Sequence, residues 1–166
     1  SPSEDHMKII LSTAATVLAL SGVAFAEGDI EKGEKVFKKC KACHAVVTGE
    51  GEALMKGGKT GPNLYGIIGR TAGTAEDFGK YSDSLVAAGE GGLVWTEELL
   101  ATFTMDPKAF LAEQLGGSAK SNMTFKLRKD EEAANVAAFL ASLAPAPEMT
   151  EGEEEGEEEG EGDGDS

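Results

Sequence analysis

Two thiols and an imidazole stand together in the run Cys40-Lys41-Ala42-Cys43-His44, and the chain contains no other cysteine. This order is the attachment signal of a c-type haem: the thiols form thioethers with the haem vinyl groups and the imidazole binds the iron. A C-x-x-C pair also occurs in redox disulfides and as half of a zinc site. Zinc usually takes four ligands, and no second Cys/His pair is present. A thioredoxin-like module needs a βαβ pattern, which is missing around this run. The residues therefore favour haem.

The N-terminus predicts export. Residues 9–26 carry no charge, follow Lys8 and end in the triplet Ala-Phe-Ala before Glu27. This is the pattern of a secretory signal peptide with an A-x-A cleavage site. We predict that residues 1–26 are an upstream extension plus a cleaved signal peptide, and that the mature protein is periplasmic. The alternative is an uncleaved segment, because eighteen uncharged residues approach the minimum for a membrane span, and the protein would then be membrane-anchored.

Acidic residues are concentrated at the C-terminus. Residues 145–166 contain eleven Asp and Glu and no Lys or Arg, whereas residues 27–144 contain 17 acidic and 14 basic residues. A segment with so few apolar residues cannot offset the entropy of ordering, so 145–166 is predicted to be a disordered acidic tail. It either acts as a solubiliser or competes with acidic partners for lysines near the haem run. Residues 27–144 form a single domain of ordinary size.

Amphipathic helices are predicted at both ends of this domain. Asp29 is a candidate N-cap for a first helix, whose apolar residues recur at helical spacing into the haem run. Asp130 is a candidate N-cap for a last helix. Gly33 allows a close backbone approach, and Phe37 offers a ring that can pack against Phe139. We therefore expect the two terminal helices to cross there.

Short helices and long loops are predicted between the terminal helices. Thr96 is a candidate N-cap, and Asp106-Pro107 places an N-cap before proline at the first helical position. Residues 45–92 are rich in glycine and show little periodicity. Such a long loop region normally counts against a compact fold, but loops can wrap a large apolar cofactor and use it as their core. The fold class is therefore predicted to be all-α.

A haem held by one histidine leaves the sixth position of its iron to be explained. Of the five methionines, only Met123 lies in a loop after the middle helices and before the last one. Met55 is in a basic loop and Met105 precedes the Asp-Pro pair, while the other two lie in the leader and the tail. Most methionines are adaptable core residues, so position alone leaves Met123 a candidate.

Several segments, in order, resemble the class I c-type cytochromes, and most of all the bacterial cytochrome c2 group. They are Gly-Glu-Lys-Val-Phe at 33–37 with the haem run, Lys-Thr-Gly-Pro-Asn-Leu-Tyr-Gly at 59–66, Gly-Arg at 69–70, Tyr-Ser-Asp at 81–83, Trp-Thr at 95–96, Asp-Pro-Lys at 106–108 and Met-Thr-Phe-Lys at 123–126. The resemblance covers residues 28–144. It implies the class I cytochrome c fold, with short helices and long loops wrapped around one covalently bound haem c and with crossing terminal helices.

The resemblance also implies a set of site residues. Haem c would be attached through Cys40 and Cys43, with His44 and Met123 as axial ligands of the iron. The backbone carbonyl of Pro62 would accept the other ring proton of His44 and fix its tautomer. The haem propionates would be held by four side chains, those of Arg70, Tyr81, Trp95 and Ser121. The chain departs from the family at Phe103, where a tyrosine usually lies near the methionine sulfur, so we expect a drier iron site.

The function implied by this resemblance is that of a soluble one-electron carrier rather than an enzyme. His and Met ligation raises the haem potential and leaves no open position for a substrate. The expected donor is a quinol:cytochrome c oxidoreductase, and the expected acceptor is a terminal oxidase or a photosynthetic reaction centre. Exposed lysines would guide a monomer to acidic docking surfaces on these membrane complexes. No nucleic acid or small-molecule substrate is expected.

Two alternatives from other classes remain open. A haem enzyme or gas sensor would need a vacant or labile sixth position on the iron. A non-haem thiol redox module would need Cys40 and Cys43 to be free.

Overall fold

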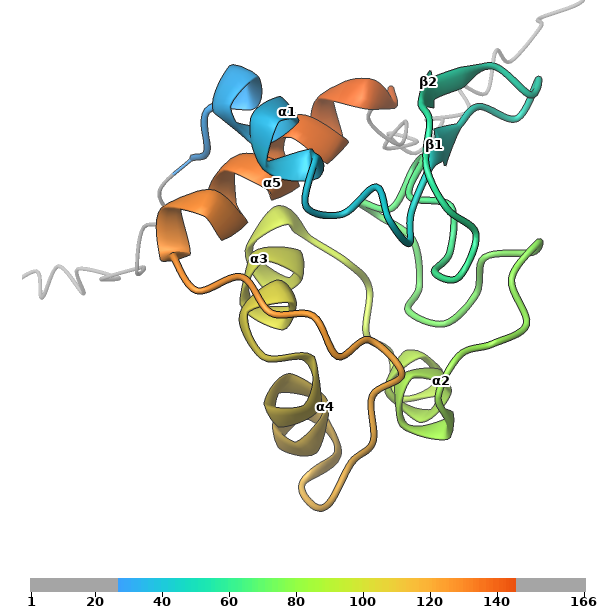
Figure 1. Cartoon of the computed structure of the whole chain (residues 1–166). Coiled ribbons are helices and arrows are strands. Elements are labelled where there is room, and N and C mark those ends of the chain that lie inside the picture. Colours follow the sequence, from blue (N-terminus) through green and yellow to red (C-terminus); the bar gives the residue numbers. More distant parts are fainter. Residues whose placement is uncertain (1–26, 146–166) are drawn as a thin grey trace, which may run out of the picture.

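Five helices and one two-stranded sheet follow one another in the computed structural model, which describes residues 27–145. In chain order they are α1 (Ile30–Phe37), β1 (Val46–Val47), β2 (Ala53–Met55), α2 (Asp83–Glu90), α3 (Glu97–Met105), α4 (Pro107–Leu115) and α5 (Asp130–Leu143) (Figure 1). Residues 1–26 and 146–166 lie outside the described part, so the predicted signal peptide and nearly all of the predicted acidic tail do too. Among residues 27–145, no helix has the length and apolar character needed to span a membrane.

The terminal helices cross at a glycine. Helix α1 begins after Asp29, whose carboxylate accepts a hydrogen bond from a first-turn N–H at 2.9 Å, and α1 lies across α5 (Figure 1). A Cβ atom added to Gly33 would overlap the carbonyl oxygen of Asn135 on α5. Fully buried Phe37 packs against Phe139 with 6.0 Å between ring centroids. The predicted N-cap and the predicted crossing are confirmed.

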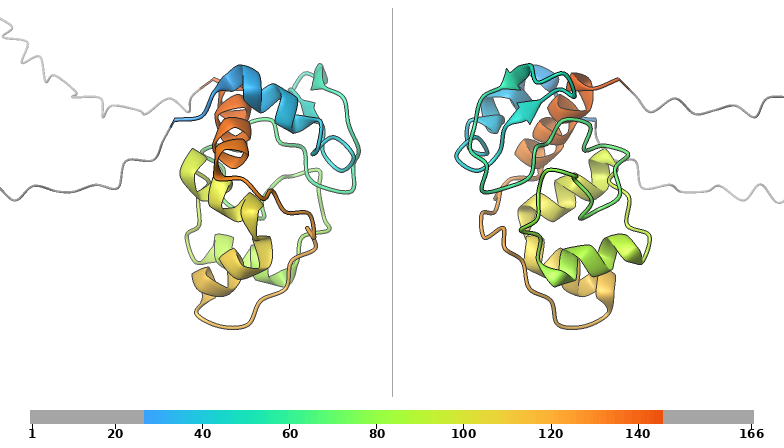
Figure 2. Two further views of the ribbon diagram at one scale, coloured as in Figure 1. Left: turned by 60° about the vertical axis from the view of Figure 1, so that its left-hand side comes forward. Right: turned by 90° about the vertical axis from the view of Figure 1, so that its right-hand side faces the viewer.

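The two predicted middle helices are also confirmed. Thr96 caps α3 by accepting a hydrogen bond from the Leu99 N–H at 3.1 Å. Asp106 caps α4 by accepting one from the Ala109 N–H at 3.0 Å, with Pro107 as the first helical residue. Helix α3 packs against α5 as well as against α4. The turned views show a long loop running from the end of α4 back to the start of α5 (Figure 2).

Residues 45–92 contain more regular structure than the sequence pattern predicts. Strands β1 and β2 pair antiparallel as a short hairpin, and α2 begins after Ser82, whose hydroxyl accepts a hydrogen bond from the Leu85 N–H at 3.2 Å. Helix α2 has only eight residues and buries only Ala88 and Gly89. Two such small buried residues give a weak periodic signal, which explains why this helix is not predicted.

Two predicted boundaries are wrong. Helix α1 ends at Phe37, so turns rather than helix carry the haem run. Helix α5 begins at Asp130 itself, and its N-cap residue, Lys129, makes no side-chain capping bond. Asp130 therefore lies in the first turn, where its negative charge still favours the positive end of the helix dipole.

Candidate haem-binding site

One cavity of about 320 Å³ brings together every predicted site residue. These residues are Cys40, Cys43, His44, Pro62, Arg70, Tyr81, Trp95, Ser121 and Met123. They come from the turns after α1, from the loop between β2 and α2, from the segment before α3 and from the loop between α4 and α5. Much of the remaining wall is apolar, with Leu64, Ile67, Phe78, Leu85, Leu100, Phe103, Val136 and Leu140 among its residues. The volume lies in the range of cofactor sites, and such walls suit a large, flat, apolar group.

A glycine-containing loop encloses the Cys-x-x-Cys-His run. The Gly58 N–H donates to the Lys41 carbonyl at 2.9 Å, and the Gly61 N–H donates to the Cys43 carbonyl at 2.8 Å. Within the run, the His44 N–H donates to the carbonyl of Cys40 at 3.0 Å. These backbone bonds fix the run as a compact series of turns at the cavity edge.

The imidazole of His44 is buried and held in one orientation. Its Nδ1 lies 2.8 Å from the carbonyl oxygen of Pro62. A carbonyl can only accept, so Nδ1 carries the proton and Nε2 keeps its lone pair. Burial lowers the pKa of His44, and the hydrogen bond to Pro62 opposes this shift. The ring also lies directly against Gly61, where an added Cβ would stand 2.7 Å from Nδ1. A neutral, oriented imidazole is the form that binds a metal.

Arg70 places a cation in the polar part of the cavity wall. Its guanidinium donates to the carbonyl oxygens of Asn63, at 3.0 Å, and Tyr65, at 3.4 Å. Burial lowers the pKa of Arg70 and the neighbouring Tyr81 opposes the shift, but a guanidinium stays charged in either case. Two of its five N–H donors are used in these bonds, so others remain for an anionic group in the cavity.

Tyr81 and Ser121 have their hydrogen bonds within the polypeptide. The hydroxyl of Tyr81 accepts a bond from the Ala75 N–H at 3.1 Å, so its proton remains to be donated. The hydroxyl of Ser121 donates to the Met123 carbonyl at 2.9 Å and accepts from the Met123 N–H at 3.2 Å. Its single proton is therefore already used, and contact with another acceptor requires the hydroxyl to turn.

Comparison with known proteins identifies the family. The family model described as Cytochrome c matches residues 30–144. The chain belongs to the cytochrome c family. It is 56% identical over 140 residues to the cytochrome c2 of Rhodobacter capsulatus, covering 82% of this chain and 98% of that protein. It is 55% identical over 136 residues to the cytochrome c-551 of Roseobacter denitrificans, covering 80% and 95%.

Solved structures agree with this assignment. The crystal structure of the cytochrome c2 of Rhodobacter sphaeroides matches with a TM-score of 0.70 and 46% identity, covering 73% of this chain and 100% of that one. The predicted resemblance to the cytochrome c2 group and the class I cytochrome c fold are therefore confirmed. This cytochrome accordingly carries one haem c, attached through Cys40 and Cys43.

Before haem attachment, the free Cys40 thiol does not have the character of a reactive redox cysteine. Burial, followed by the neighbouring Cys43, raises the pKa of Cys40 to about 11, and Lys39 opposes the shift only partly. A reactive redox cysteine instead has a lowered pKa. Within residues 27–145, no group of three or more His, Cys, Asp or Glu side chains is arranged to bind a metal ion.

Phe103 gives the haem cavity of this cytochrome an aromatic wall. Phe103 is 7% exposed and lines the same cavity as Met123. Its ring centroid lies 5.0 Å from that of Trp95 and 5.7 Å from that of Phe110. Phenylalanine at this position adds no hydroxyl to the cavity wall.

One structural residue of this site is absent from the sequence-based prediction. Asn63 accepts a hydrogen bond from the Val47 N–H at 2.9 Å and donates one to the Val47 carbonyl at 2.8 Å. It thereby joins the β1–β2 hairpin to the loop that carries Pro62 and supplies the carbonyl that Arg70 contacts. An asparagine beside proline and glycine looks like an ordinary turn residue, so its sequence context gave no signal of this role.

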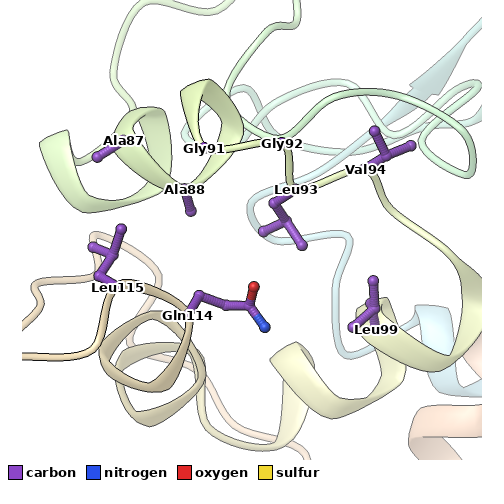
Figure 3. Close-up of a pocket in the computed structure, with 9 residues that line it drawn as sticks. All are labelled: Ala87, Ala88, Gly91, Gly92, Leu93, Val94, Leu99, Gln114 and Leu115. Atoms are coloured by element: carbon purple, nitrogen blue, oxygen red, sulfur yellow. The ribbon is translucent and has the colours of Figure 1, made fainter.

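A second cavity of about 340 Å³ lies apart from the haem cavity, between α2, the residues after it, α3 and α4 (Figure 3). Its lining is glycine and apolar side chains apart from Gln114, the only polar side chain among the nine residues that form it. None of these residues titrates or acts as a nucleophile, so the chemistry of this cytochrome belongs to the first cavity.

Proposed function

We propose that this cytochrome carries single electrons between membrane redox complexes, with His44 and Met123 as the axial ligands of its haem iron. The observation that supports this most strongly is the convergence of both thiols, the neutral imidazole and the thioether on one largely apolar cavity. When bound, the haem supplies the one-electron couple. Ligation by His44 and Met123 would raise the potential of the bound haem and leave no open position for a substrate, which suits electron transfer and not substrate turnover.

The polypeptide around the cavity has two tasks in this proposal. The Pro62 carbonyl holds His44 in the tautomer that leaves Nε2 free. Arg70 and Tyr81 offer donors to the propionates, together with the Trp95 indole. Ser121 can donate to a propionate only if its hydroxyl turns away from the Met123 carbonyl.

The first test separates a carrier from an enzyme, a gas sensor or a thiol module. Exported protein is expected to have a mass increased by one haem, and its reduced form is expected not to bind carbon monoxide at neutral pH. Mass spectrometry and difference absorption spectra measure the two results. Carbon monoxide binding by the native reduced protein would favour an open sixth position and thus an enzyme or sensor. A mass without haem would favour free Cys40 and Cys43.

Exposed lysines at the cavity edge supply the proposed docking surface. Lys39 and Lys80 line the cavity, and Lys41 is exposed within the haem run. Lys39 also pairs with Glu132 at 2.9 Å, so α5 neutralises part of its charge. We propose that a monomer presents this edge to acidic surfaces on a quinol:cytochrome c oxidoreductase and on an oxidase or reaction centre. Such contacts are weak, fast and sensitive to salt.

The acidic tail offers a test of this electrostatic docking. Removing residues 147–166 is expected to speed electron transfer with an acidic partner at low salt, because the tail competes for the same lysines, and to have little effect at high salt. Stopped-flow rates over a salt series measure this. A tail of equal length with its acids changed to glutamine separates charge from length. Equal rates for the full-length, truncated and glutamine-tail proteins would mean that the tail does not compete for the lysines and acts only as a solubiliser.

The proposed location is the periplasm. The support is the signal-peptide pattern of residues 1–26, which lies outside the described residues, and the family match at 30–144, which falls inside the proposed domain 27–144. An uncleaved, anchored form remains the alternative. N-terminal sequencing of the exported protein distinguishes the two, with a start near Glu27 expected.

A further inference from the structure

The loop that carries Met123 has no buried side chain of its own near that residue. Ala119 and Leu127 are buried, at 7% and 3% exposure, but the seven residues between them are exposed or only half-buried. Core packing therefore fixes the loop most firmly at its two ends, and Met123 itself is only partly buried against the core. Hydrogen bonds must locate the part between, since exposed chain without such bonds samples many conformations.

The C-terminal end of this loop is tied to α3 and α4. The Leu127 N–H donates to the Thr104 carbonyl at 2.8 Å. The ammonium group of Lys126 lies 3.1 Å from the Asp106 carboxylate, although both groups are largely in solvent. These contacts hold the chain three and four residues after Met123.

Two other bonds tie the N-terminal side of the loop to the start of α2 and the residues just before it. The Asn122 side-chain amide donates to the Lys80 carbonyl at 2.9 Å. The Lys120 N–H donates to the Ser84 hydroxyl at 2.9 Å. We call this pair of bonds the clasp. Its partners lie 42 and 36 residues apart in the sequence, so it joins two separate walls of the cavity.

The bonds of Ser121 have a different effect. Its hydroxyl contacts only the N–H and the carbonyl of Met123, two residues along. These bonds stiffen the loop locally but do not attach it to the rest of the fold. On the N-terminal side of Met123, attachment to the facing wall depends on the clasp.

We propose that the clasp positions Met123, so that Asn122 and Ser84 determine how easily another ligand replaces its thioether on the iron. This inference rests on the proposed function, because it takes Met123 as an axial ligand. With the clasp closed, the loop lies against residues 80–84 and the thioether stays in the cavity. With the clasp broken, the loop swings out more often, and a competing ligand reaches the iron.

Imidazole is a suitable probe, since it binds ferric haem iron where a thioether leaves. The full-length holoprotein and the variants Asn122→Ala, Ser84→Ala and the double variant are titrated with imidazole. We expect each single variant to bind imidazole about threefold more tightly and the double variant roughly tenfold, because an exposed hydrogen bond contributes only a small net stabilisation. The far-red band of sulfur-ligated ferric haem is expected to persist in all of them without imidazole.

Two further variants separate positioning from general stability. Ser84 lies within α2, where alanine is a better helix former, so Ser84→Ala should not lower resistance to urea although it raises imidazole affinity. Thr102→Ala removes an exposed hydroxyl that donates to the Glu98 carbonyl within α3, and is expected to leave imidazole affinity unchanged.

The outcomes distinguish the inference from the function on which it rests. A wild-type protein without the far-red band would overturn Met123 as ligand, and the clasp with it. If the band is present and the double variant binds imidazole like the wild type, the function stands and the clasp has no positioning role. An affinity increase in Thr102→Ala as large as in Asn122→Ala would also overturn the inference, because the effect would then be non-specific.

Discussion

Replacing Met123 by alanine is expected to abolish the far-red absorption band and to lower the reduction potential. Thioether ligation favours ferrous over ferric iron, so its loss stabilises the oxidised form. We expect a fall of about 0.1 V or more, within the roughly 0.8 V over which axial ligands set haem potentials. Because alanine leaves the sixth position open, the reduced variant should also bind carbon monoxide. Absorption spectroscopy and redox titration measure these effects.

The chain offers matched controls for this variant. Met55 and Met105 are also partly buried, but neither lines the haem cavity. Met55→Ala and Met105→Ala are therefore expected to keep the band and the potential. If either control loses the band while Met123→Ala retains it, the assignment of the sixth ligand is wrong.

The parts of the fold that the sequence predicts are those governed by local chemistry. Asp29, Thr96 and Asp106 each cap a helix through a bond to an N–H three residues on, and such short-range bonds are visible in sequence spacing. The crossing at Gly33 and Phe37 is predictable for a related reason: glycine and a large aromatic residue on one helical face mark a close contact.

The parts that escaped prediction depend on long-range contacts. Helix α2 buries only Ala88 and Gly89, so its sequence shows almost no apolar periodicity. The bonds from Asn63 to Val47 and from Asn122 to Lys80 join residues 16 and 42 positions apart. Nothing in the spacing of these polar residues identifies their partners. That Arg70, Tyr81, Trp95 and Ser121 lie in one cavity was likewise implied by the family resemblance and not by their positions in the chain.

Replacing Gly33 by alanine is expected to destabilise the protein strongly. Alanine is intrinsically better than glycine within a helix by about 1 kcal/mol, so a surface site would gain stability. At Gly33 the added methyl group would overlap the Asn135 carbonyl oxygen and stand 2.6 Å from the Cβ of Phe139. Backbone cannot yield as a flexible side chain can, so α1 must move away from α5. We expect the free energy of unfolding to fall by about 3 kcal/mol, at the upper end of typical overpacking effects.

Urea unfolding followed by circular dichroism measures this loss, and Gly49→Ala is its control. Gly49 has open space around its Cβ position and no positive φ, so alanine there should change stability by no more than about 0.5 kcal/mol. Since α1 leads directly into Cys40 and His44, a displaced α1 should also disturb the haem environment, and the Soret absorption of folded Gly33→Ala should differ from that of Gly49→Ala. Stability of Gly33→Ala equal to that of the control would mean that the two terminal helices can separate freely, and that their close contact is not what positions the haem run.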